Sequence, residues 1–315
     1  MTQPDEQSFE GELAEAKSEL SELRAENTRL RGLLGLDDRA TVGPRTAWKP
    51  TLFTPAESTS PVVVAVDRAS SAAAKIALFR SLFVGRDDVY AQRWDNERSG
   101  KGGWGPVVRG GWANARRPDR EYLPYTDEVV ETHLAGGFHA GLYPLLRGDS
   151  CRLLACDFDG PGWAADALAY FDAAHAEGIP AALERSRSGD GGHVWVFFAG
   201  KVPAASARRI GVHLLREAMT VRADLDLASY DRLFPAQDFM PKGQFGNLIA
   251  LPLHGGCRKR GTTVFLDPGN LEPFEDQWAF LSTIEPLSTE AVVSLAGAFG
   301  ELVLSATLAE HAAVG

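Results

Sequence analysis

Two carboxylates separated by a single residue end a short apolar segment in the middle of the chain. Segment 152–160 carries them as Asp157 and Asp159. Successive side chains of a β-strand point to opposite faces, so both acids would share one face with Leu153 and Ala155, about 7 Å apart. A divalent cation would relieve their repulsion, and an all-oxygen site suits Mg²⁺ or Mn²⁺. A strand that ends in a polar turn explains the same residues without a metal, so both interpretations stay open.

Two further polar residues lie at the ends of expected strands. The glycine-rich turn 188–192 leads into His193, which begins an apolar run, and Asp231 ends the short segment 228–231. Backbone N–H groups in a glycine-rich turn can approach phosphate oxygens closely. His193 could equally be a structural residue, and Asp238 could take the place of Asp231 as a third acid.

Alternating strands and helices would position these residues. A helix at 163–177 lies between the strand that ends at Asp159 and a strand at 181–184, which together form a crossover unit. A second amphipathic helix is expected at 204–222. Around this centre the pattern predicts helices at 70–84 and 127–134 and strands at 89–94, 245–253 and 262–266.

Four stretches in this order resemble the catalytic core of the archaeo-eukaryotic primase superfamily, the primase–polymerases. The resemblance is closest to the primase domain of TOTE conflict-system proteins. The stretches are 154–159, 184–195, 230–235 and 246–252, within a region of about 70–285. The resemblance implies the fold class α+β, with an RRM-like primase–polymerase catalytic core and an additional N-terminal α/β subdomain, preceded by a coiled-coil helix.

The resemblance also implies an activity: template-dependent nucleotidyl transfer by a DNA primase or DNA polymerase, in a prokaryotic defence, conflict or replication–repair system. Asp157, Asp159 and Asp231 would hold two divalent metals about 4 Å apart, and His193 would bind the triphosphate. Further nucleotide contacts are expected at Ser188, Arg185, Arg187, Lys242 and Asn247. The implied partners are nucleoside triphosphates, a single-stranded or primed DNA template, and a helicase or nuclease partner or continuation.

Two other functions use the same residues. A metal-dependent nuclease or phosphodiesterase could employ the same acids without a nucleoside triphosphate. A non-catalytic nucleic-acid-binding module could keep the fold and bind DNA unchanged after Asp157→Ala.

The N-terminal segment 9–35 has the spacing of a short coiled coil, because its leucines and Ala16 recur at alternating intervals of three and four residues, with Asn27 in the one gap. Asn27 falls at an a position, where one buried polar residue favours a parallel dimer in register. We therefore expect a coiled-coil helix at 1–36 that forms a homodimer through residues 9–36, with a helix packed on its own domain as the alternative. The other expected boundaries are a linker at 37–60, the catalytic domain at 61–284 and a C-terminal helical segment at 285–315.

The formal net charge of −10 is unevenly distributed. Residues 1–40 carry −5 and residues 285–315 carry −4, so the middle of the chain carries about −1. A nearly neutral core with local basic patches is compatible with binding to a phosphate backbone. Segment 95–122 has Trp104 and Trp112 interleaved with basic residues. These side chains could hold a nucleic-acid strand by stacking and charge, although a solvated loop explains the segment too.

The 315 residues include 3 cysteines without a Cys-x-x-Cys pair, which argues against a zinc knuckle or a disulfide framework. The sequence has no apolar run long enough for a signal peptide or a membrane span, so we expect a cytoplasmic protein without a membrane partner.

Overall fold

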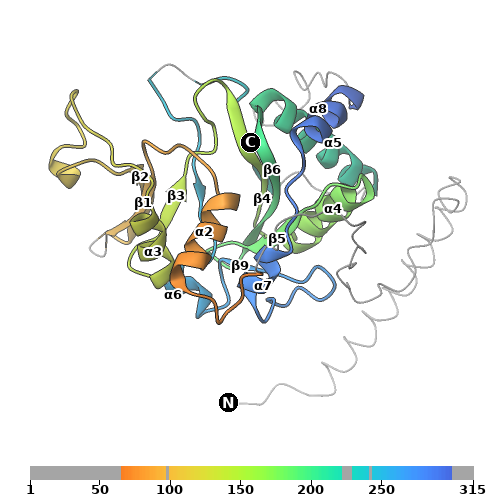
Figure 1. The fold of residues 1–315 in the computed structure, drawn as a ribbon, viewed down its shortest axis with the longest axis horizontal. Coiled ribbons are helices and arrows are strands. Elements are labelled where there is room, and N and C mark those ends of the chain that lie inside the picture. The colour runs from red at the N-terminus through yellow and green to blue at the C-terminus, as the bar shows by residue number, and fades with distance from the viewer. Residues whose placement is uncertain (1–64, 97–98, 222–228, 241–242, 300–315) are drawn as a thin grey trace, which may run out of the picture. The chain divides into compact units, whose positions relative to one another are not determined.

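The computed structural model describes residues 65–96, 99–221, 229–240 and 243–299, which belong to one compact unit. The expected coiled-coil helix at 1–36, the linker at 37–60 and Lys242 lie outside the described residues. Within the described part, α-helices combine with two antiparallel sheets, which confirms the predicted α+β class (Figure 1).

The central sheet of the described residues has five strands in the order β7-β4-β6-β5-β9. Because β6 lies between β4 and β5, the unit β4-α4-β5-β6-α5-β7 is a split β-α-β arrangement, which agrees with the RRM-like core expected from the motifs. The bounds are β4 (Ser150–Asp159), α4 (Trp163–Ala176), β5 (Ala182–Arg185), β6 (Gly191–Pro203), α5 (Ala204–Val221), β7 (Tyr230–Phe234) and β9 (Val264–Phe265).

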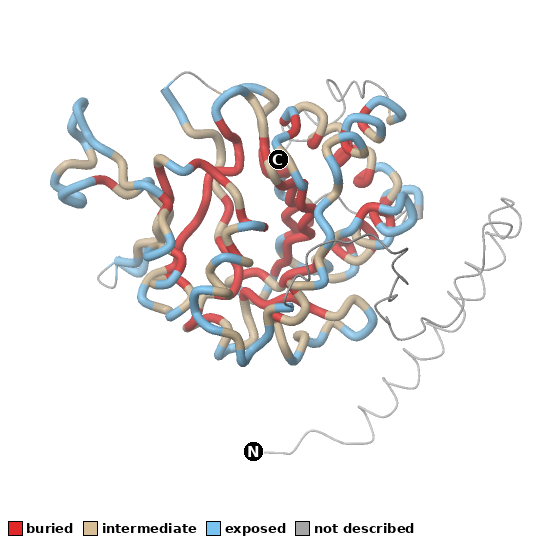
Figure 2. Tube along the Cα trace, viewed as in Figure 1, coloured by how far each residue is buried: buried red, intermediate tan, exposed pale blue. Residues whose placement is uncertain are grey.

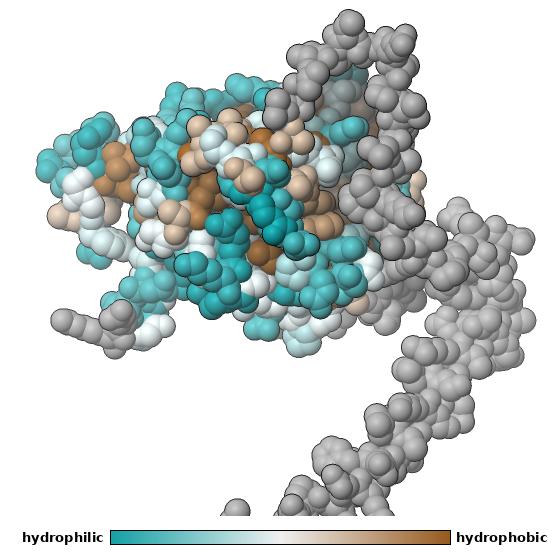
Figure 3. All heavy atoms as spheres, turned by 60° about the horizontal axis from the view of Figure 1, so that its bottom comes forward, coloured by the Kyte–Doolittle hydropathy of each residue, from teal (hydrophilic) through white to brown (hydrophobic). Residues whose placement is uncertain are grey.

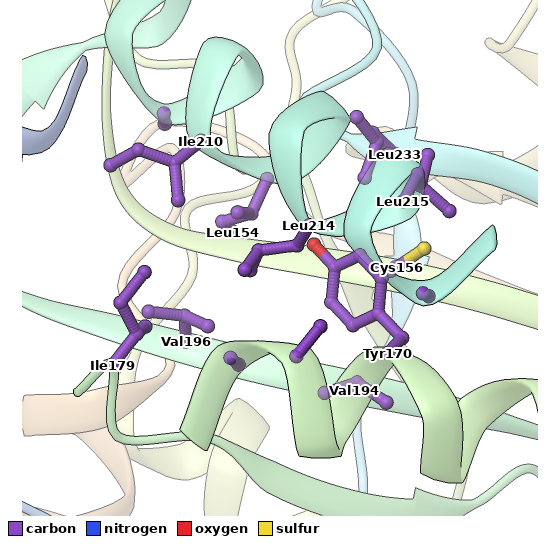
Figure 4. Packing of buried hydrophobic residues seen from close by; sticks show 14 of the residues in the cluster. Leu154, Cys156, Tyr170, Ile179, Val194, Val196, Ile210, Leu214, Leu215 and Leu233 are labelled. Carbon is purple, nitrogen blue, oxygen red and sulfur yellow. The ribbon is translucent and has the colours of Figure 1, made fainter. Parts of the chain in front are cut away.

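One face of this sheet packs against helices. Leu154 and Cys156 of β4 lie in a hydrophobic cluster with residues of α4 and α5 (Figure 4). Phe158, the next residue on this face of β4, belongs to the same cluster. On α4 the fully buried Ala167, Tyr170 and Ala174 recur at helical spacing, so one stripe of the helix meets the sheet. Helix α8 (Thr289–Ala298) contributes Val292 and Ala296 to the same cluster, so this part of the expected C-terminal segment packs with the central sheet and its helices.

The opposite face of the central sheet packs against α2 (Ala72–Leu82) and faces the second sheet. Leu153 and Ala155 lie on this face, as the strand alternation predicts. The ring of Phe83, just after α2, meets Trp195 and Phe197 of β6 edge-on, with centroids 5.2 Å apart in both cases. Such edge-to-face pairs favour a single packing of α2 on the sheet.

The second sheet has the strand order β2-β1-β3-β8 within the described residues. It combines β1 (Ala91–Asn96), β2 (Lys101–Pro106) and β3 (Ala140–Leu142) with the late strand β8 (Ile249–Ala250). The hydrophobic cluster under α2 takes side chains from both sheets, so the expected N-terminal subdomain is not separate from the rest of the described structure. The connecting helices are η2 (Gly111–Ala113), α3 (Asp127–Ala135), α6 (Gly255–Arg258) and α7 (Gln277–Ser282).

Two strand predictions near the carboxylates were wrong in extent. The strand expected to end at Asp231 instead continues to Phe234, which pairs with Ala155. The expected strand 245–253 is reduced to β8. Its residue Asn247 instead bonds through its side chain to the backbone of Leu233 and Ala236.

Buried residues concentrate along the central strands and the helices against them, and exposed residues lie on the outer loops (Figure 2). The face drawn in Figure 3 is largely hydrophilic, with hydrophobic residues in small areas between the polar ones. Among the described residues, no helix is both long enough and apolar enough to cross a membrane.

Candidate active site

Strand pairing places four charged or titratable side chains in one row across the central sheet. Asp157 of β4 pairs with His193 of β6 on one side and with Arg232 of β7 on the other. His193 pairs in turn with Glu184 of β5. Residues directly opposite each other in antiparallel strands project from the same face, so these four side chains are neighbours. The row lies at the edge of the sheet where one glycine-rich connection leaves β4 and another enters β6.

Asp157, Asp159 and Asp231 form a cluster at this edge, with carboxylate oxygens all within 4.8 Å of one another. Asp157 is largely buried, with 9% of its surface exposed, whereas Asp159 and Asp231 are open to solvent. The donors are therefore oxygens alone, anchored on two strands and open to solvent on one side. This set fits a hard divalent cation that keeps positions for water and a substrate oxygen. The prediction that Asp157 and Asp159 point to one side of β4 agrees with this arrangement.

A β-bulge brings Asp231 into the cluster. Arg232 pairs with Asp157, but Tyr230 pairs with Phe158, so β7 has one residue more than β4 at this point. In regular pairing Asp231 would lie opposite Phe158, whose side chain enters the helix-covered core. The extra residue changes the direction of the side chains on the bulged strand. Asp231 therefore reaches the carboxylates, and Tyr230 packs on the hydrophobic core in its place.

The environment of Asp157 disfavours an isolated negative charge. Burial raises its pKa, the charge of His193 lowers it, and Asp159 and Asp231 raise it further, to about 6. Arg232 lies at the same edge, where its Nε donates to Oδ2 of Asp231 at 2.6 Å. A bound cation would add to the positive charge that His193 and Arg232 already bring to this cluster of acids.

His193 is held by a buried carboxylate that the sequence analysis did not assign to the site. Its Nδ1 lies 2.7 Å from Oε2 of Glu184, and its Nε2 lies 3.3 Å from Oδ1 of Asp157. Trp195 also donates its indole N–H to Oε2 of Glu184, at 2.8 Å. Burial lowers the pKa of His193, but Glu184 and Asp157 together raise it to about 9. The imidazole is therefore a cationic hydrogen-bond donor at neutral pH. The sequence did offer one signal for Glu184, because an acidic residue stands within the otherwise apolar strand expected at 181–184.

A second buried acid supports the position of Asp159. The backbone N–H of Asp159 donates to the carbonyl of Ser229 at 2.6 Å, and the hydroxyl of Ser229 donates to Asp166 in the first turn of α4. Gly191 lies against the other side of Asp159, since a Cβ atom there would be 2.3 Å from Oδ1. Asp159 thus contacts backbone from β6 and from the residue before β7, while its side chain stays exposed.

The structure gives several other predicted residues different surroundings. Arg185 donates to the carbonyls of Gly261 and Leu271, and Asn247 bonds to the backbone around β7, so both join loops together. Ser188 lies in the turn before β6, where its hydroxyl bonds to Ser186 and accepts from the backbone N–H of Asp190.

Arg187 and Asp238 have interactions of their own. The positive charge of Arg187 acts on His139 and His254. Asp238, the alternative third acid, pairs with Arg208 and is not in the carboxylate cluster.

The basic and aromatic segment 95–122 borders a separate cavity of about 570 Å³. The part of this segment after β2, which includes η2, projects from the second sheet (Figure 1). Trp112 is 72% exposed and meets Trp94 edge-on. Arg109 and Arg117 are paired with acids, whereas the cavity wall includes Trp94, Trp112, Arg116, Arg120 and Tyr122. This cavity presents both aromatic faces and guanidinium groups.

A family model described as the archaeo-eukaryotic primase domain of TOTE conflict systems matches residues 74–295. A solved structure, the polymerase domain from Mycobacterium tuberculosis ligase D in complex with DNA, aligns with a TM-score of 0.38 and 17% identity over 74% of this chain and 87% of that chain. Comparison with curated proteins found no match. The family match covers more than half of the chain and spans β4, β6 and β7, which carry the carboxylates and His193. This chain therefore belongs to the family of archaeo-eukaryotic primase domains of TOTE conflict systems.

Proposed function

We propose that this protein is a template-dependent nucleotidyltransferase that acts as a DNA primase, a DNA polymerase or both, in a prokaryotic conflict or repair system. One observation carries the proposal: three carboxylates from two adjacent strands lie together, and Asp157 also adjoins a cationic histidine. Nucleotidyl transfer needs negative ligands for cations beside a positive group for a triphosphate, and this row of side chains has both.

In the proposed reaction, the 3′-hydroxyl of a primer or first nucleotide attacks the α-phosphorus of a nucleoside triphosphate. A new P–O bond forms, the bond between the α-phosphorus and its bridging oxygen breaks, and pyrophosphate leaves. Two Mg²⁺ or Mn²⁺ ions held by Asp157, Asp159 and Asp231 would lower the pKa of the attacking hydroxyl and stabilise the leaving pyrophosphate.

The residues around the cluster have distinct tasks in this scheme. His193 donates a charged hydrogen bond to a phosphate oxygen of the incoming nucleotide, and Glu184 keeps its ring in place. The backbone of the glycine-rich turn before β6 leaves room for the triphosphate. Arg232 is close enough to Asp231 to neutralise its charge when no substrate is bound.

We assign contact with the single-stranded template to the cavity beside η2. Trp112 offers an exposed ring for base stacking, and Arg116 and Arg120 offer positive charge for the backbone. Stacking on aromatic rings together with arginine contacts is the usual way to hold a single strand without reading its sequence.

The test is incorporation of labelled nucleotides on a DNA template, with and without a primer, in Mg²⁺ and in Mn²⁺. Product is expected with wild-type protein and none with Asp157→Ala or Asp159→Ala, although circular dichroism should show both variants folded. A parallel reaction without nucleoside triphosphates detects cleavage of the DNA. Incorporation that survives either substitution would remove the metal-site assignment. DNA cleavage without incorporation would identify a nuclease, and unchanged DNA binding with no chemistry would identify a binding module.

A further inference from the structure

A second group of metal-binding side chains lies outside the carboxylate cluster. We propose that His139, His254 and Cys257 form a binding site for a thiophilic transition-metal cation such as Zn²⁺. One nitrogen or sulfur atom from each residue lies within 4.8 Å of the others. His139 directly precedes β3, whereas His254 caps α6 and Cys257 lies in that helix. A bound cation would therefore tie the second sheet to the segment that follows β8.

His139 has the arrangement of a histidine that is prepared for a metal. Its Nε2 lies 2.9 Å from the carbonyl oxygen of Leu251, which can only accept, so Nε2 carries the proton. The lone pair is then on Nδ1, which is buried and has no hydrogen-bond partner in the described part of the chain. Metal-bound histidines commonly donate their second ring nitrogen to a carbonyl, which orients the ring. A buried nitrogen without a partner is rare, and a cation would satisfy it.

His254 and Cys257 have a spacing that suits a common ligand. The Nδ1 of His254 lies 3.2 Å from Sγ of Cys257 and accepts a long hydrogen bond from the backbone N–H of Cys257. In a tetrahedral zinc site, bond lengths near 2.0 Å to nitrogen and 2.3 Å to sulfur set these two atoms about 3.5 Å apart. For both atoms to bind one ion, Nδ1 must release the N–H of Cys257, and the His254 ring must turn away from its stacking on His139, where the centroids lie 4.7 Å apart.

A nearby histidine shows what a purely structural imidazole looks like in this fold. The ring of His133 lies 5.2 Å from that of His139 and 5.4 Å from that of His254. Both of its nitrogens are occupied, because Nε2 bonds to the carbonyl of Pro252 at 2.8 Å and Nδ1 accepts from Ala140 at 3.1 Å. His133 therefore has no nitrogen to offer, and the available set is His139, His254 and Cys257.

The donor set and its charges decide which cation fits. Two imidazoles and a thiol prefer Zn²⁺ to Mg²⁺ or Mn²⁺, which prefer the oxygens of the aspartate cluster. The Nη2 of Arg260 lies 3.3 Å from Sγ of Cys257, so a guanidinium offsets the negative charge of a thiolate ligand. Three protein ligands leave one position of a tetrahedron, and the half-buried His254 leaves the site accessible to a water molecule there.

The test measures Zn²⁺ itself on the full chain. Protein stripped with a chelator and dialysed is titrated with ZnCl₂ against a chromophoric zinc chelator, in excess Mg²⁺ so that the aspartate cluster does not compete. Wild type is expected to bind one equivalent. Because each variant removes a ligand, Cys257→Ser and His254→Gln should each weaken the affinity by more than about a hundredfold.

Two variants serve as matched controls. Asp157→Asn alters the other candidate metal group, and His213→Gln removes a half-buried histidine on α5. Both should keep the single high-affinity equivalent, and circular dichroism verifies that every variant is folded. Co²⁺ bound to wild type should show a thiolate charge-transfer band that is absent from Cys257→Ser.

Several results would overturn the proposal. One is a wild-type protein whose affinity for zinc is no higher than that of Cys257→Ser. Another is tight zinc binding that is lost in Asp157→Asn, which would place the ion on the carboxylates. The third is a Co²⁺ complex of wild type without a thiolate band.

Discussion

The Nδ1 of His193 lies 2.7 Å from Oε2 of Glu184, and that carboxylate is only 1% exposed. The contact joins two neighbouring strands and turns Nε2 of His193 toward Asp157. A buried carboxylate next to an imidazole favours its charged form. The pair therefore turns an ordinary strand histidine into a fixed, cationic donor beside the proposed metal ligands.

Loss of the imidazole should affect nucleotide use more than DNA binding. In His193→Ala, the charged hydrogen bond to the triphosphate is absent, which is worth roughly 1.5–3 kcal/mol, or about tenfold to over a hundredfold in affinity. The measurement is the KM for nucleotide beside the Kd for template DNA. Equal nucleotide affinity in variant and wild type would contradict this role of His193.

Glu184 is expected to act through His193 as a positioning residue. Glu184→Gln preserves the size of the side chain but removes the negative charge next to the ring. The KM for nucleotide should rise about tenfold, with a smaller change in kcat, and His193→Ala should add little to the double variant because both act through one contact. Independent, additive effects of the two substitutions would show that Glu184 has only a structural role.

The third acid can be identified by a pair of matched substitutions. Asp231 belongs to the carboxylate cluster, whereas Asp238 pairs with Arg208. Asp231→Asn should lower nucleotide incorporation by more than about a hundredfold, since a metal ion contributes several kcal/mol to the transition state. Asp238→Asn should keep most of the activity. The opposite order of the two rates would exchange the assignments.

The hydroxyl of Tyr170 has no hydrogen-bond partner in the described part of the chain, although the side chain is fully buried. Removing an unpaired buried polar group should stabilise the fold, so Tyr170→Phe is expected to raise the free energy of unfolding by about 1 kcal/mol or more at pH 7. Tyr122→Phe is the control, because the Tyr122 hydroxyl accepts a hydrogen bond from Arg120 and its removal should bring no gain.

The same residue predicts a dependence on alkaline pH. Burial raises the pKa of Tyr170 well above its usual value of 10.0. Above pH 10 the unfolded chain releases this proton and the folded chain keeps it, so stability falls as pH rises, by up to about 1.4 kcal/mol per pH unit. Tyr170→Phe lacks this contribution. Urea unfolding at pH 7, 10 and 11 should therefore show a widening advantage of the variant, and a constant difference would contradict the pKa shift.

Deletion of residues 1–36 tests the expected coiled coil, which lies outside the described residues. We expect the full chain to sediment as a homodimer and the truncated chain as a monomer, because the leucine seam with Asn27 would be removed. The truncated protein should still incorporate nucleotides, since every proposed catalytic residue lies beyond residue 150. A monomeric full chain would disprove the dimer, and loss of incorporation would place the helix in the catalytic unit.

Local pattern alone was enough for much of the catalytic sheet. The alternation of Leu153, Ala155 and Asp157 with Leu154 and Cys156 correctly predicted which side chains share a face of β4. Alternation is a property of the extended backbone itself and needs no knowledge of the neighbouring strands. Helical periodicity is equally local, so the helices at 163–177 and 204–222 were predicted to within a few residues. The order of the short motifs indicated the family.

Only the tertiary structure decided how distant segments meet. The bulge that directs Asp231 into the cluster is a matter of register between β4 and β7, and a single residue of slip would turn its side chain into the core. The same holds for Glu184, which becomes a site residue only because β5 pairs with β6 beside His193. Register depends on the packing of both faces of the sheet, which the residues near Asp231 do not encode by themselves.

The tertiary structure also gives some motif residues partners other than the expected nucleotide. In addition, it brings together residues that no motif had linked. Arg185 and Asn247 lie within the motif stretches, but their side chains bond to loop carbonyls and backbone amides. Conversely, the absence of a Cys-x-x-Cys pair argued against a zinc knuckle, yet the fold brings Cys257 of α6 next to His139, which lies far away in the sequence. Spacing along the chain can reveal ligands that share one turn or strand. His139, just before β3, meets His254 and Cys257 only because β3 pairs with β8 in the second sheet and α6 follows β8.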